Sequence, residues 1–203
     1  MAHPIDSKSP SEEDLLRRSA LGDEEAFLAL YRRRQAGVYR FAMHMSGSAS
    51  IAEEVTQEVF MAVFQEGSRF DPDRGSAAAF LYGIARNQVL RCLERNKRYV
   101  GLETEDGNPA EPRADSEDPS LELARVQAIE AVRQAVLTLP APYREAVVLC
   151  DLEEVSYADA AVAMKVPVGT VRSRLSRGRS LLEEKLRSVG KPGKSFNAMR
   201  CFA

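Results

Sequence analysis

The sequence contains no tryptophan, and only two histidines and three cysteines among its 203 residues. Cys92, Cys150 and Cys201 lie far apart, form no CxxC pair and do not cluster with the histidines. A zinc site needs several such ligands at short spacing, so we expect no metal site and no cofactor. Cys92 and Cys150 fall within apolar helical patterns, which predicts reduced thiols in the core.

Long hydrophobic runs are also missing. No apolar run has the length of a membrane span, and the opening residues, MAHPIDSKSP, lack the apolar core of a signal peptide. We therefore expect a cytoplasmic protein without membrane insertion. No nucleophile–base pair or Gly-rich phosphate loop is present, so we expect no enzyme. Aromatic residues make up only 7%, while Ala, Leu, Arg and Glu dominate. This composition predicts an all-α fold.

The net charge of -2 is close to zero and does not by itself indicate nucleic acid, but the charges are unevenly distributed. Residues 84–98 carry five basic side chains and one acidic one, and residues 170–180 carry four arginines and no acid. Between them, residues 101–122 hold eight acidic residues against Arg113 alone. The pattern predicts two phosphate-facing surfaces joined by a solvated linker.

Apolar residues recur at spacings of three and four along most of the chain, which is typical of amphipathic helices. The expected helices cover residues 11–45, 51–65, 77–97, 121–137, 143–152, 157–164 and 168–189. Residues 100–119 lack periodicity and contain three prolines, which predicts a flexible linker. The predicted organisation is a disordered terminus (1–10), a first domain (11–98), a linker (99–120), a second domain (121–189) and a tail (190–203).

Three short helices near the carboxyl end have the spacing of a helix-turn-helix. Ser156 is expected to cap one helix, with Asp159 three residues further on. Ala160 and Ala163 are small enough for the next helix to cross closely, and residues 165–169, KVPVG, supply a tight connection.

The last helix separates into an apolar and a basic face. Its expected buried face comprises Val171, Leu175, Gly178, Leu182 and Leu186. The expected base-reading residues near its amino end are Thr170, Arg172, Ser173, Ser176 and Arg177. Arg174 and Arg179 flank them and are better placed for phosphates. The alternative interpretation is an ordinary solvated basic face, which the adjoining cap, turn and small residues make less favourable.

The segment LPAPYREAVVLCDLEEVSYADAAVAMKVPVGTVRSRLSRGRSLLEEKL resembles the fourth conserved region of extracytoplasmic-function (ECF) sigma factors, a subfamily of the sigma-70 family. AEEVTQEVFMAVF resembles the polymerase-binding part of region two, and FDPDRGSAAAFLYGIARNQVLRCLERNKR resembles the part that melts and reads the minus-ten element. The resemblance implies two all-helical domains, a region 2 bundle and a region 4 helix-turn-helix, joined by the flexible acidic linker.

The resemblance also implies roles for individual residues. Glu54, Gln57 and Glu58 would dock on the clamp helices of the largest polymerase subunit, and region 4 on the flap of the second largest. Asn87 would contact an unstacked base, because an amide has both donors and acceptors. The residues that would hold backbone phosphates are Arg86, Arg91, Arg95, Lys97 and Arg98.

Four positions depart from the family pattern. Phe80 stands where tryptophan is usual, and Gly83 stands where a basic residue is frequent. Cys150 replaces an arginine that in many members contacts the minus-thirty-five element, so the preferred promoter sequence does not follow from the resemblance. Ala160 replaces a larger aliphatic residue, which predicts a lighter core.

The function implied is that of a sigma factor, which binds core RNA polymerase and directs initiation by recognising minus-thirty-five and minus-ten promoter DNA. An anti-sigma factor is the further expected partner. The alternative is a stand-alone helix-turn-helix regulator, as in two-component response regulators. That alternative needs a receiver domain with strands and an acidic pocket, and the first hundred residues have the pattern of neither.

Overall fold

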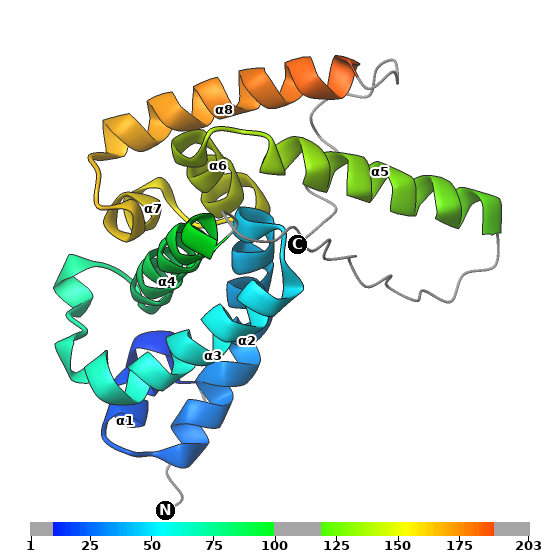
Figure 1. Cartoon of the computed structure of the whole chain (residues 1–203). Coiled ribbons are helices and arrows are strands. Elements are labelled where there is room, and N and C mark those ends of the chain that lie inside the picture. Colours follow the sequence, from blue (N-terminus) through cyan, green and yellow to red (C-terminus); the bar gives the residue numbers. More distant parts are fainter. Residues whose placement is uncertain (1–9, 100–118, 189–203) are drawn as a thin grey trace, which may run out of the picture.

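The computed structural model describes residues 10–99 and 119–188, which form helices and no strand (Figure 1). The all-α prediction is therefore confirmed for the described chain. The elements are α1 (Glu12–Ala20), α2 (Glu24–Ser46), α3 (Ala49–Glu66), η1 (Gly67–Arg69), η2 (Pro72–Arg74), α4 (Ala77–Tyr99), α5 (Pro119–Leu137), α6 (Ala141–Val147), η3 (Val148–Leu152), α7 (Tyr157–Met164) and α8 (Val168–Ser188).

The predicted linker, 99–120, lies outside the described residues except at its ends, where α4 stops and α5 starts. The predicted tail, 190–203, and the amino-terminal segment before Pro10 also lie outside them. The domain limits therefore stay predictions. We refer below to α1–α4 with their turns as the N-terminal unit, and to α5–α8 with η3 as the C-terminal unit.

One helix predicted over residues 11–45 is in fact two, α1 and α2. Ser11 caps the first as expected, since its side chain accepts a hydrogen bond from the Asp14 amide. The break follows at Gly22, whose φ of 90° is open to glycine and costly for other residues. Asp23 then caps α2 by accepting from the Ala26 amide at 3.0 Å. The apolar residues keep their spacing of three and four across this break, so the periodicity of the sequence does not predict it.

The N-terminal unit has an aliphatic and aromatic core. Leu30 and Phe41 of α2, Val55 and Val59 of α3, and Leu81 of α4 are essentially inaccessible to solvent. The amino end of α4 is also held in place, because the Glu13 carboxylate of α1 accepts a hydrogen bond from the Ala77 amide at 3.3 Å. The core therefore sets the position of α4, which carries the predicted minus-ten residues.

The C-terminal unit contains the predicted helix-turn-helix. Ser156 caps α7 by accepting from the Asp159 amide at 3.1 Å, as expected. Lys165 ends α7 in the left-handed conformation, with φ 55°, so that the chain turns directly into α8. At Gly178 an added Cβ would lie 2.7 Å from a Val147 methyl group, so α8 crosses α6 where only glycine fits. These local features fix the direction of α8.

The two units pack against each other. α7 lies across α4, and α2 contacts α5, α6 and η3 (Figure 1). Arg144 of α6 donates a hydrogen bond of 2.6 Å to the Met45 carbonyl near the end of α2. Ala160, expected to lighten the core of the second domain, is completely buried. No local pattern in the chain predicts this packing between the units.

Candidate nucleic-acid and polymerase interfaces

The face of α8 opposite its core is basic and exposed. Val171, Leu175 and Leu182 are buried, and Gly178 lies on the same buried side, while Leu186 is only partly covered. The predicted base-reading residues Arg172, Ser173, Ser176 and Arg177 are all exposed, and Thr170 is half-buried. The Ser173 hydroxyl donates to the Thr170 carbonyl at 3.0 Å. The predicted division of the helix into two faces is confirmed.

The arginines of α8 differ in their partners. Within the described residues, Arg172, Arg174 and Arg177 form no ion pair. Arg179, predicted to hold a phosphate, instead binds Asp151 of η3, with Nε 3.0 Å from Oδ2. The hydrogen bond to Asp151 raises the pKa of Arg179. Arg179 therefore fixes α8 to η3, while the other three cations remain available to an external anion.

The basic residues predicted on α4 lie in different surroundings. Nε of Arg86 is 3.2 Å from Oε2 of Glu145 in α6, and these side chains are only 20% and 4% exposed. Arg95 donates to both carboxylate oxygens of Glu54, at 2.9 and 2.8 Å. Arg91 is exposed and Asn87 is half-buried. The side chains of Lys97 and Arg98 lie outside the described residues. Among the described side chains of α4, the structure thus brings together no continuous basic strip.

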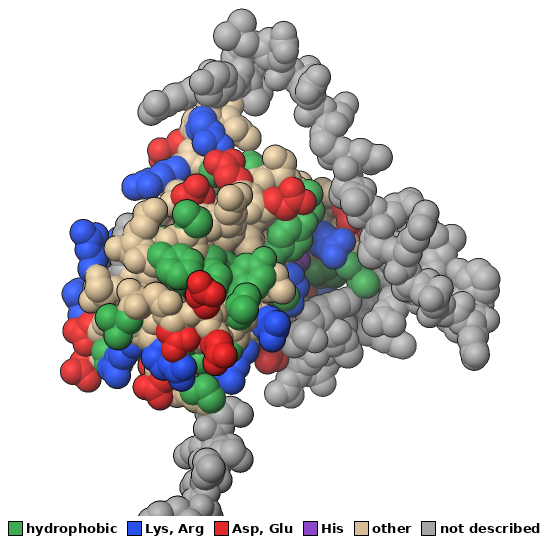
Figure 2. Space-filling view, turned by 90° about the horizontal axis from the view of Figure 1, so that it is seen from below, with side chains coloured by type: hydrophobic (Ala, Val, Ile, Leu, Met, Phe, Trp, Pro, Cys, Tyr) green, Lys and Arg blue, Asp and Glu red, His purple; other side chains and the backbone are tan. Residues whose placement is uncertain are grey.

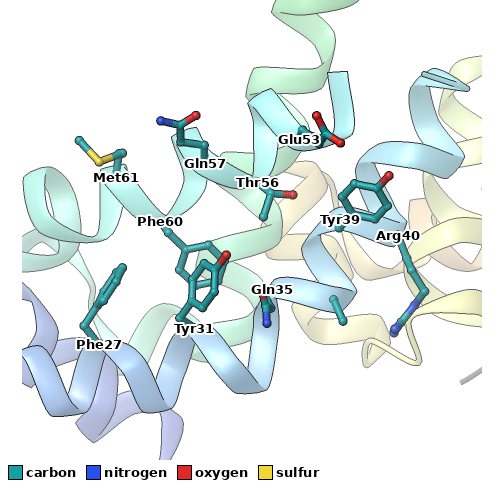
Figure 3. A pocket seen from close by; sticks show the side chains of 11 residues that line it. Phe27, Tyr31, Gln35, Tyr39, Arg40, Glu53, Thr56, Gln57, Phe60 and Met61 are labelled. Carbon is teal, nitrogen blue, oxygen red and sulfur yellow. The ribbon is translucent and has the colours of Figure 1, made fainter. Parts of the chain in front are cut away.

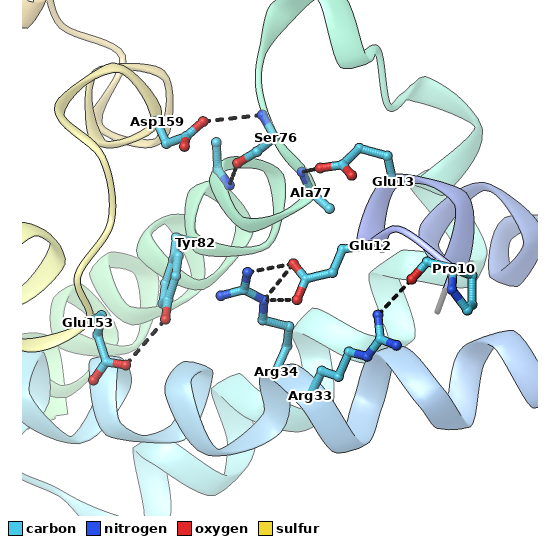
Figure 4. Close-up of polar contacts among 11 residues, drawn as sticks. Pro10, Glu12, Glu13, Arg33, Arg34, Ser76, Ala77, Tyr82, Glu153 and Asp159 are labelled. Atoms are coloured by element: carbon cyan, nitrogen blue, oxygen red, sulfur yellow. Dashed lines mark hydrogen bonds and ion pairs between the residues drawn. The ribbon is translucent and has the colours of Figure 1, made fainter. Parts of the chain in front are cut away.

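A buried carboxylate joins the two units beside α4 (Figure 4). The side chain of Glu153 is 1% exposed, accepts from the Tyr82 hydroxyl at 3.3 Å and binds Arg40 of α2 at 2.9 Å. Burial raises the pKa of Tyr82, and the Glu153 charge adds to the increase. Burial likewise raises the pKa of Glu153, although the hydrogen bond from Arg40 opposes this. Sequence reasoning missed this network, because its members lie in three separate segments.

The amino end of α4 is capped from two directions (Figure 4). Asp159 of α7 accepts from the Ser76 amide at 3.2 Å, and Glu13 of α1 accepts from the next amide, that of Ala77. The Ser76 hydroxyl accepts from the Ala79 amide at 3.1 Å. Carboxylates at a helix amino end satisfy free N–H groups and complement the helix dipole. The C-terminal unit thus completes the capping of a helix in the N-terminal unit.

A hollow lies where the turns before α4 meet α7. It has a volume of about 480 Å³, and its lining includes Arg69, Arg74, Phe80, Val162 and Lys165. Phe80, which stands where tryptophan is usual in the family, is half-buried, and its ring meets Phe70 edge-on at 5.6 Å. The basic and aromatic residues at this place come from both units.

A groove between α2 and α3 is a mostly apolar hollow on the N-terminal unit (Figure 3). Its volume is about 610 Å³, and its lining includes Phe27, Tyr31 and Phe60. The ring of Tyr31 meets Phe60 edge-on, with 4.7 Å between the ring centroids, and Phe27 also contacts the neighbouring Phe64 at 4.4 Å. Met61 and Phe64 remain 49% and 45% exposed, unusually high for such apolar residues. Figure 2 shows hydrophobic side chains gathered on one face, bordered by charged ones.

The predicted polymerase-binding residues of α3 have different neighbours. Gln57 lines the groove, and Glu58 is exposed. Glu54 faces α4, where it binds Arg95. The groove residues Phe27, Tyr31 and Phe60 were missed, although the spacing of four between Phe27 and Tyr31 is visible in the sequence.

Both described cysteines are free. Cys92 is buried, as predicted, and Cys150 is half-buried in η3. Burial raises the pKa of the Cys150 thiol to about 11, with Asp151 contributing, so this thiol is protonated at neutral pH. In residues 10–99 and 119–188 no helix has the length and hydrophobicity to cross a membrane. The same residues hold no group of three or more side chains suited to a metal ion.

Comparison with known proteins agrees with this geometry. Residues 30–99 match the model of sigma-70 region 2, and residues 129–182 match that of sigma-70 region 4. The ECF RNA polymerase sigma factor SigM of Mycobacterium tuberculosis is 31% identical over 172 residues, which cover 85% of this chain and 83% of SigM. This chain belongs to the ECF sigma factors. Because the first half matches region 2, a stand-alone helix-turn-helix regulator is not favoured.

Other ECF sigma factors are similarly related. SigE of Mycolicibacterium smegmatis is 37% identical over 174 residues, and the chain spans only 65% of its length. Among solved structures, CnrH in complex with the cytosolic domain of CnrY aligns with a TM-score of 0.66 at 25% identity, covering 89% of this chain and all of CnrH. The sigma factor RpoE of Bartonella quintana, in complex with the anti-sigma factor NepR, aligns at 0.64 over 79% of this ECF sigma factor and 96% of RpoE.

Proposed function

We propose that this ECF sigma factor binds core RNA polymerase and directs initiation at promoters that its two units read together. The observation that carries the proposal is the face of α8: Arg172, Arg174 and Arg177 project from a capped helix-turn-helix without an ion pair among the described residues. Arginine recognises guanine edges and phosphates, and serine adapts to several bases. In this role α8 reads the minus-thirty-five element, and the chain catalyses nothing itself.

The polymerase contact is assigned to the α2–α3 groove. An exposed groove of aromatic rings and a methionine favours burial against an apolar partner surface, and Gln57 and Glu58 at its side supply polar contacts. The clamp helices of the largest subunit are the proposed partner, with the flap of the second largest subunit contacting the C-terminal unit. Glu54 is not assigned a direct contact with the polymerase, because its carboxylate already forms an ion pair with Arg95 of α4.

The minus-ten strand is assigned to α4. Asn87 can donate to and accept from an unstacked base, and the exposed Arg91 is placed for a phosphate. Arg86 reaches DNA only after Glu145 has released it, since the ion pair buries both side chains.

The matched structures of CnrH and RpoE are complexes with CnrY and with the anti-sigma factor NepR. We propose that an anti-sigma factor likewise regulates this chain, in the cytoplasm where its polymerase acts.

Reconstitution with core polymerase tests the proposal. The purified chain is expected to co-elute with core polymerase in size-exclusion chromatography and to permit run-off transcription from a promoter selected out of random duplex DNA. Met61→Glu places a charge in the groove and is expected to abolish co-elution. Leu21→Glu is the matched control, because Leu21 is 88% exposed and lies away from the groove. A wild-type chain that fails to bind core polymerase would overturn the proposal.

A further inference from the structure

The ion pair between Asp151 and Arg179 lies beside the base-reading residues of α8. Arg179 follows Ser176 by three residues and Arg172 by seven, so these three side chains lie on one side of the helix. Nε of Arg179 donates to one carboxylate oxygen of Asp151 at 3.0 Å, and a terminal nitrogen donates to the other oxygen. A two-pronged contact of this kind fixes direction as well as distance. The pair therefore restrains the rotation of α8 about its own axis.

The backbone of η3 places Asp151 at this contact. η3 is a π turn, in which the Glu153 amide donates to the Val148 carbonyl, five residues back, at 2.9 Å. The chain leaves the turn through Glu154, whose φ of 52° is unfavourable for a residue with a side chain. π turns are rare and occur frequently at functional sites. The chain thus adopts a costly local conformation next to the residue that binds Arg179.

The two members of the pair differ in exposure. The side chain of Asp151 is only 10% exposed, whereas that of Arg179 is 42% exposed. The carboxylate is therefore held by the fold, and the guanidinium reaches it from the helix that carries the base-reading face. η3 itself contributes no basic side chain, since its residues are Val, Leu, Cys, Asp and Leu. The charge of Arg179 is neutralised where α8 meets η3, which withholds it from a DNA phosphate.

We propose that Asp151 is a positioning residue for promoter recognition, which acts through Arg179 to set the rotation of α8. The proposal rests on the proposed function, in which α8 reads the minus-thirty-five element, and it adds a residue on which the specificity depends. Arg172 and Ser176 meet their base edges in the rotational setting that the pair maintains. Without the pair α8 can turn, and the released Arg179 becomes a sequence-independent phosphate contact. Loss of Asp151 therefore strengthens binding to any DNA and weakens the discrimination between sequences.

The packing of α8 on α6 offers a competing explanation for the orientation of α8. An added Cβ at Gly178 would lie 2.7 Å from a Val147 methyl group and 3.1 Å from the Tyr143 carbonyl oxygen. The two helices are therefore in close contact one residue before Arg179. Because glycine has no side chain to interlock, this contact sets the distance between the helices and leaves the rotation to the ion pair. The two explanations predict different results when the pair is removed.

Fluorescence anisotropy with holoenzyme, formed from the full chain and core polymerase, tests the proposal. One probe is a fluorescein-labelled duplex selected from random DNA by wild-type holoenzyme, and the other is a duplex of the same length and composition with a scrambled sequence. The ratio of the two affinities reports specificity. The slope of log affinity against log salt, measured with the scrambled duplex in potassium chloride, reports the number of phosphates that the protein neutralises.

Asp151→Ala is expected to lower the ratio by about fivefold or more, since base contacts are misplaced. It should also make the salt slope steeper by about 0.9, the value of one added phosphate contact. Arg179→Met removes the pair without releasing a cation, so it should lower the ratio equally and leave the slope unchanged. Asp151→Glu keeps the pair and should retain most of the wild-type ratio.

Glu183→Ala is the matched control. It raises the net charge by the same amount as Asp151→Ala and releases Arg187, an exposed arginine at the far end of α8. Neither the ratio nor the slope should change in this variant. A loss of ratio as large as that of Asp151→Ala would overturn the proposal, because the added charge alone would then explain it.

Two further results would overturn the proposal. A slope shallower by about 0.9 with an unchanged ratio in Arg179→Met would show that Arg179 holds a phosphate in the wild type. The wild-type ratio in Asp151→Ala would show that the packing at Gly178 alone orients α8. Circular dichroism checks the helical content of each variant, and Arg179→Met with Asp151→Glu decides the question where Asp151→Ala does not fold. Failure of wild-type holoenzyme to form, or to distinguish the two duplexes, would instead overturn the proposed function.

Discussion

The basic helices α4 and α8 differ in the partners of their arginine side chains. On α4, Arg86 binds Glu145 of the other unit and Arg95 binds Glu54 of a neighbouring helix. On α8, Arg172 and Arg177 are exposed and have no ion-pair partner among the described residues. A cluster of arginines therefore indicates a nucleic-acid surface only when its charges are not already neutralised within the protein. The comparison predicts that arginines of α4 contribute mainly to stability, and those of α8 to binding.

The largest effect is expected from Arg86. Arg86→Ala leaves the 4% exposed Glu145 carboxylate without its cation, and breaking such a buried pair should lower the free energy of unfolding by about 3–5 kcal/mol. Arg177→Ala, on an exposed residue, should change it by less than about 0.5 kcal/mol. Urea denaturation followed by circular dichroism measures both. The double variant Arg86→Met/Glu145→Leu should recover most of the loss. Equal effects of the two single substitutions would remove the distinction between the helices.

The stability of the chain should also depend on pH through His44 of α2. Burial, with the nearby charges of Arg133 in α5 and Arg40 in α2, lowers the pKa of His44 to about 4. The unfolded chain takes up this proton at higher pH than the folded chain does. Stability is therefore complete above pH 6.5 and falls as the pH drops from there toward 4, by about 3 kcal/mol in total.

His44→Gln removes this titration, and the matched measurement is urea denaturation of wild type and variant at several pH values between 7 and 4.5. The wild type should lose more stability than the variant on acidification. Parallel pH profiles would show that His44 titrates normally in the folded chain.

On α8 the expected effect is on binding. Arg177→Ala should weaken promoter binding by holoenzyme by about 1–3 kcal/mol, and Arg172→Ala should also relax the preference at one base of the minus-thirty-five element. Arg174→Ala should weaken binding evenly across sequences, as loss of a phosphate contact does. Arg187→Ala is the control, because this exposed arginine pairs with Glu183 at the far end of the helix. Identical sequence profiles for Arg172→Ala and Arg174→Ala would contradict the assigned faces.

The smallest effect is expected from Ser156. Its hydroxyl caps α7 and also lies 2.8 Å from the Asp159 carboxylate that caps α4. Ser156→Ala should cost about 1 kcal/mol in thermal or urea unfolding. Ser180→Ala, in the middle of α8, should stay within about 0.5 kcal/mol. Equal costs for Ser156→Ala and Ser180→Ala would contradict the capping role of Ser156.

Local features of the fold could be predicted from the sequence. The Ser156 cap and the buried stripe of α8 follow from spacing and residue type, and the structure has both. The break at Gly22 was hidden, because apolar spacing continues across it.

The partners of charged residues could not be predicted. Arg86 and Glu145 are far apart in the chain, and nothing local distinguishes Arg86 from the exposed Arg91. Arg179 lies in the same basic run of α8 as Arg172, yet Arg179 forms an ion pair with Asp151. Which cations face solvent depends on how the units pack, and this is set by close contacts such as the one between Gly83 and Ala163.

The absence of tryptophan has a practical consequence for the buried Tyr82. With excitation in the tyrosine absorption band, where phenylalanine hardly absorbs, the emission of this chain comes from its six tyrosines. Tyr82 is 2% exposed and hydrogen-bonded to Glu153, while the ring of Tyr31 meets Phe60 edge-on in the groove. One ring therefore lies at the junction of the two units, and the other at the proposed polymerase contact. The unlabelled chain carries an intrinsic optical reporter at each place, and single Tyr→Phe variants can assign each signal.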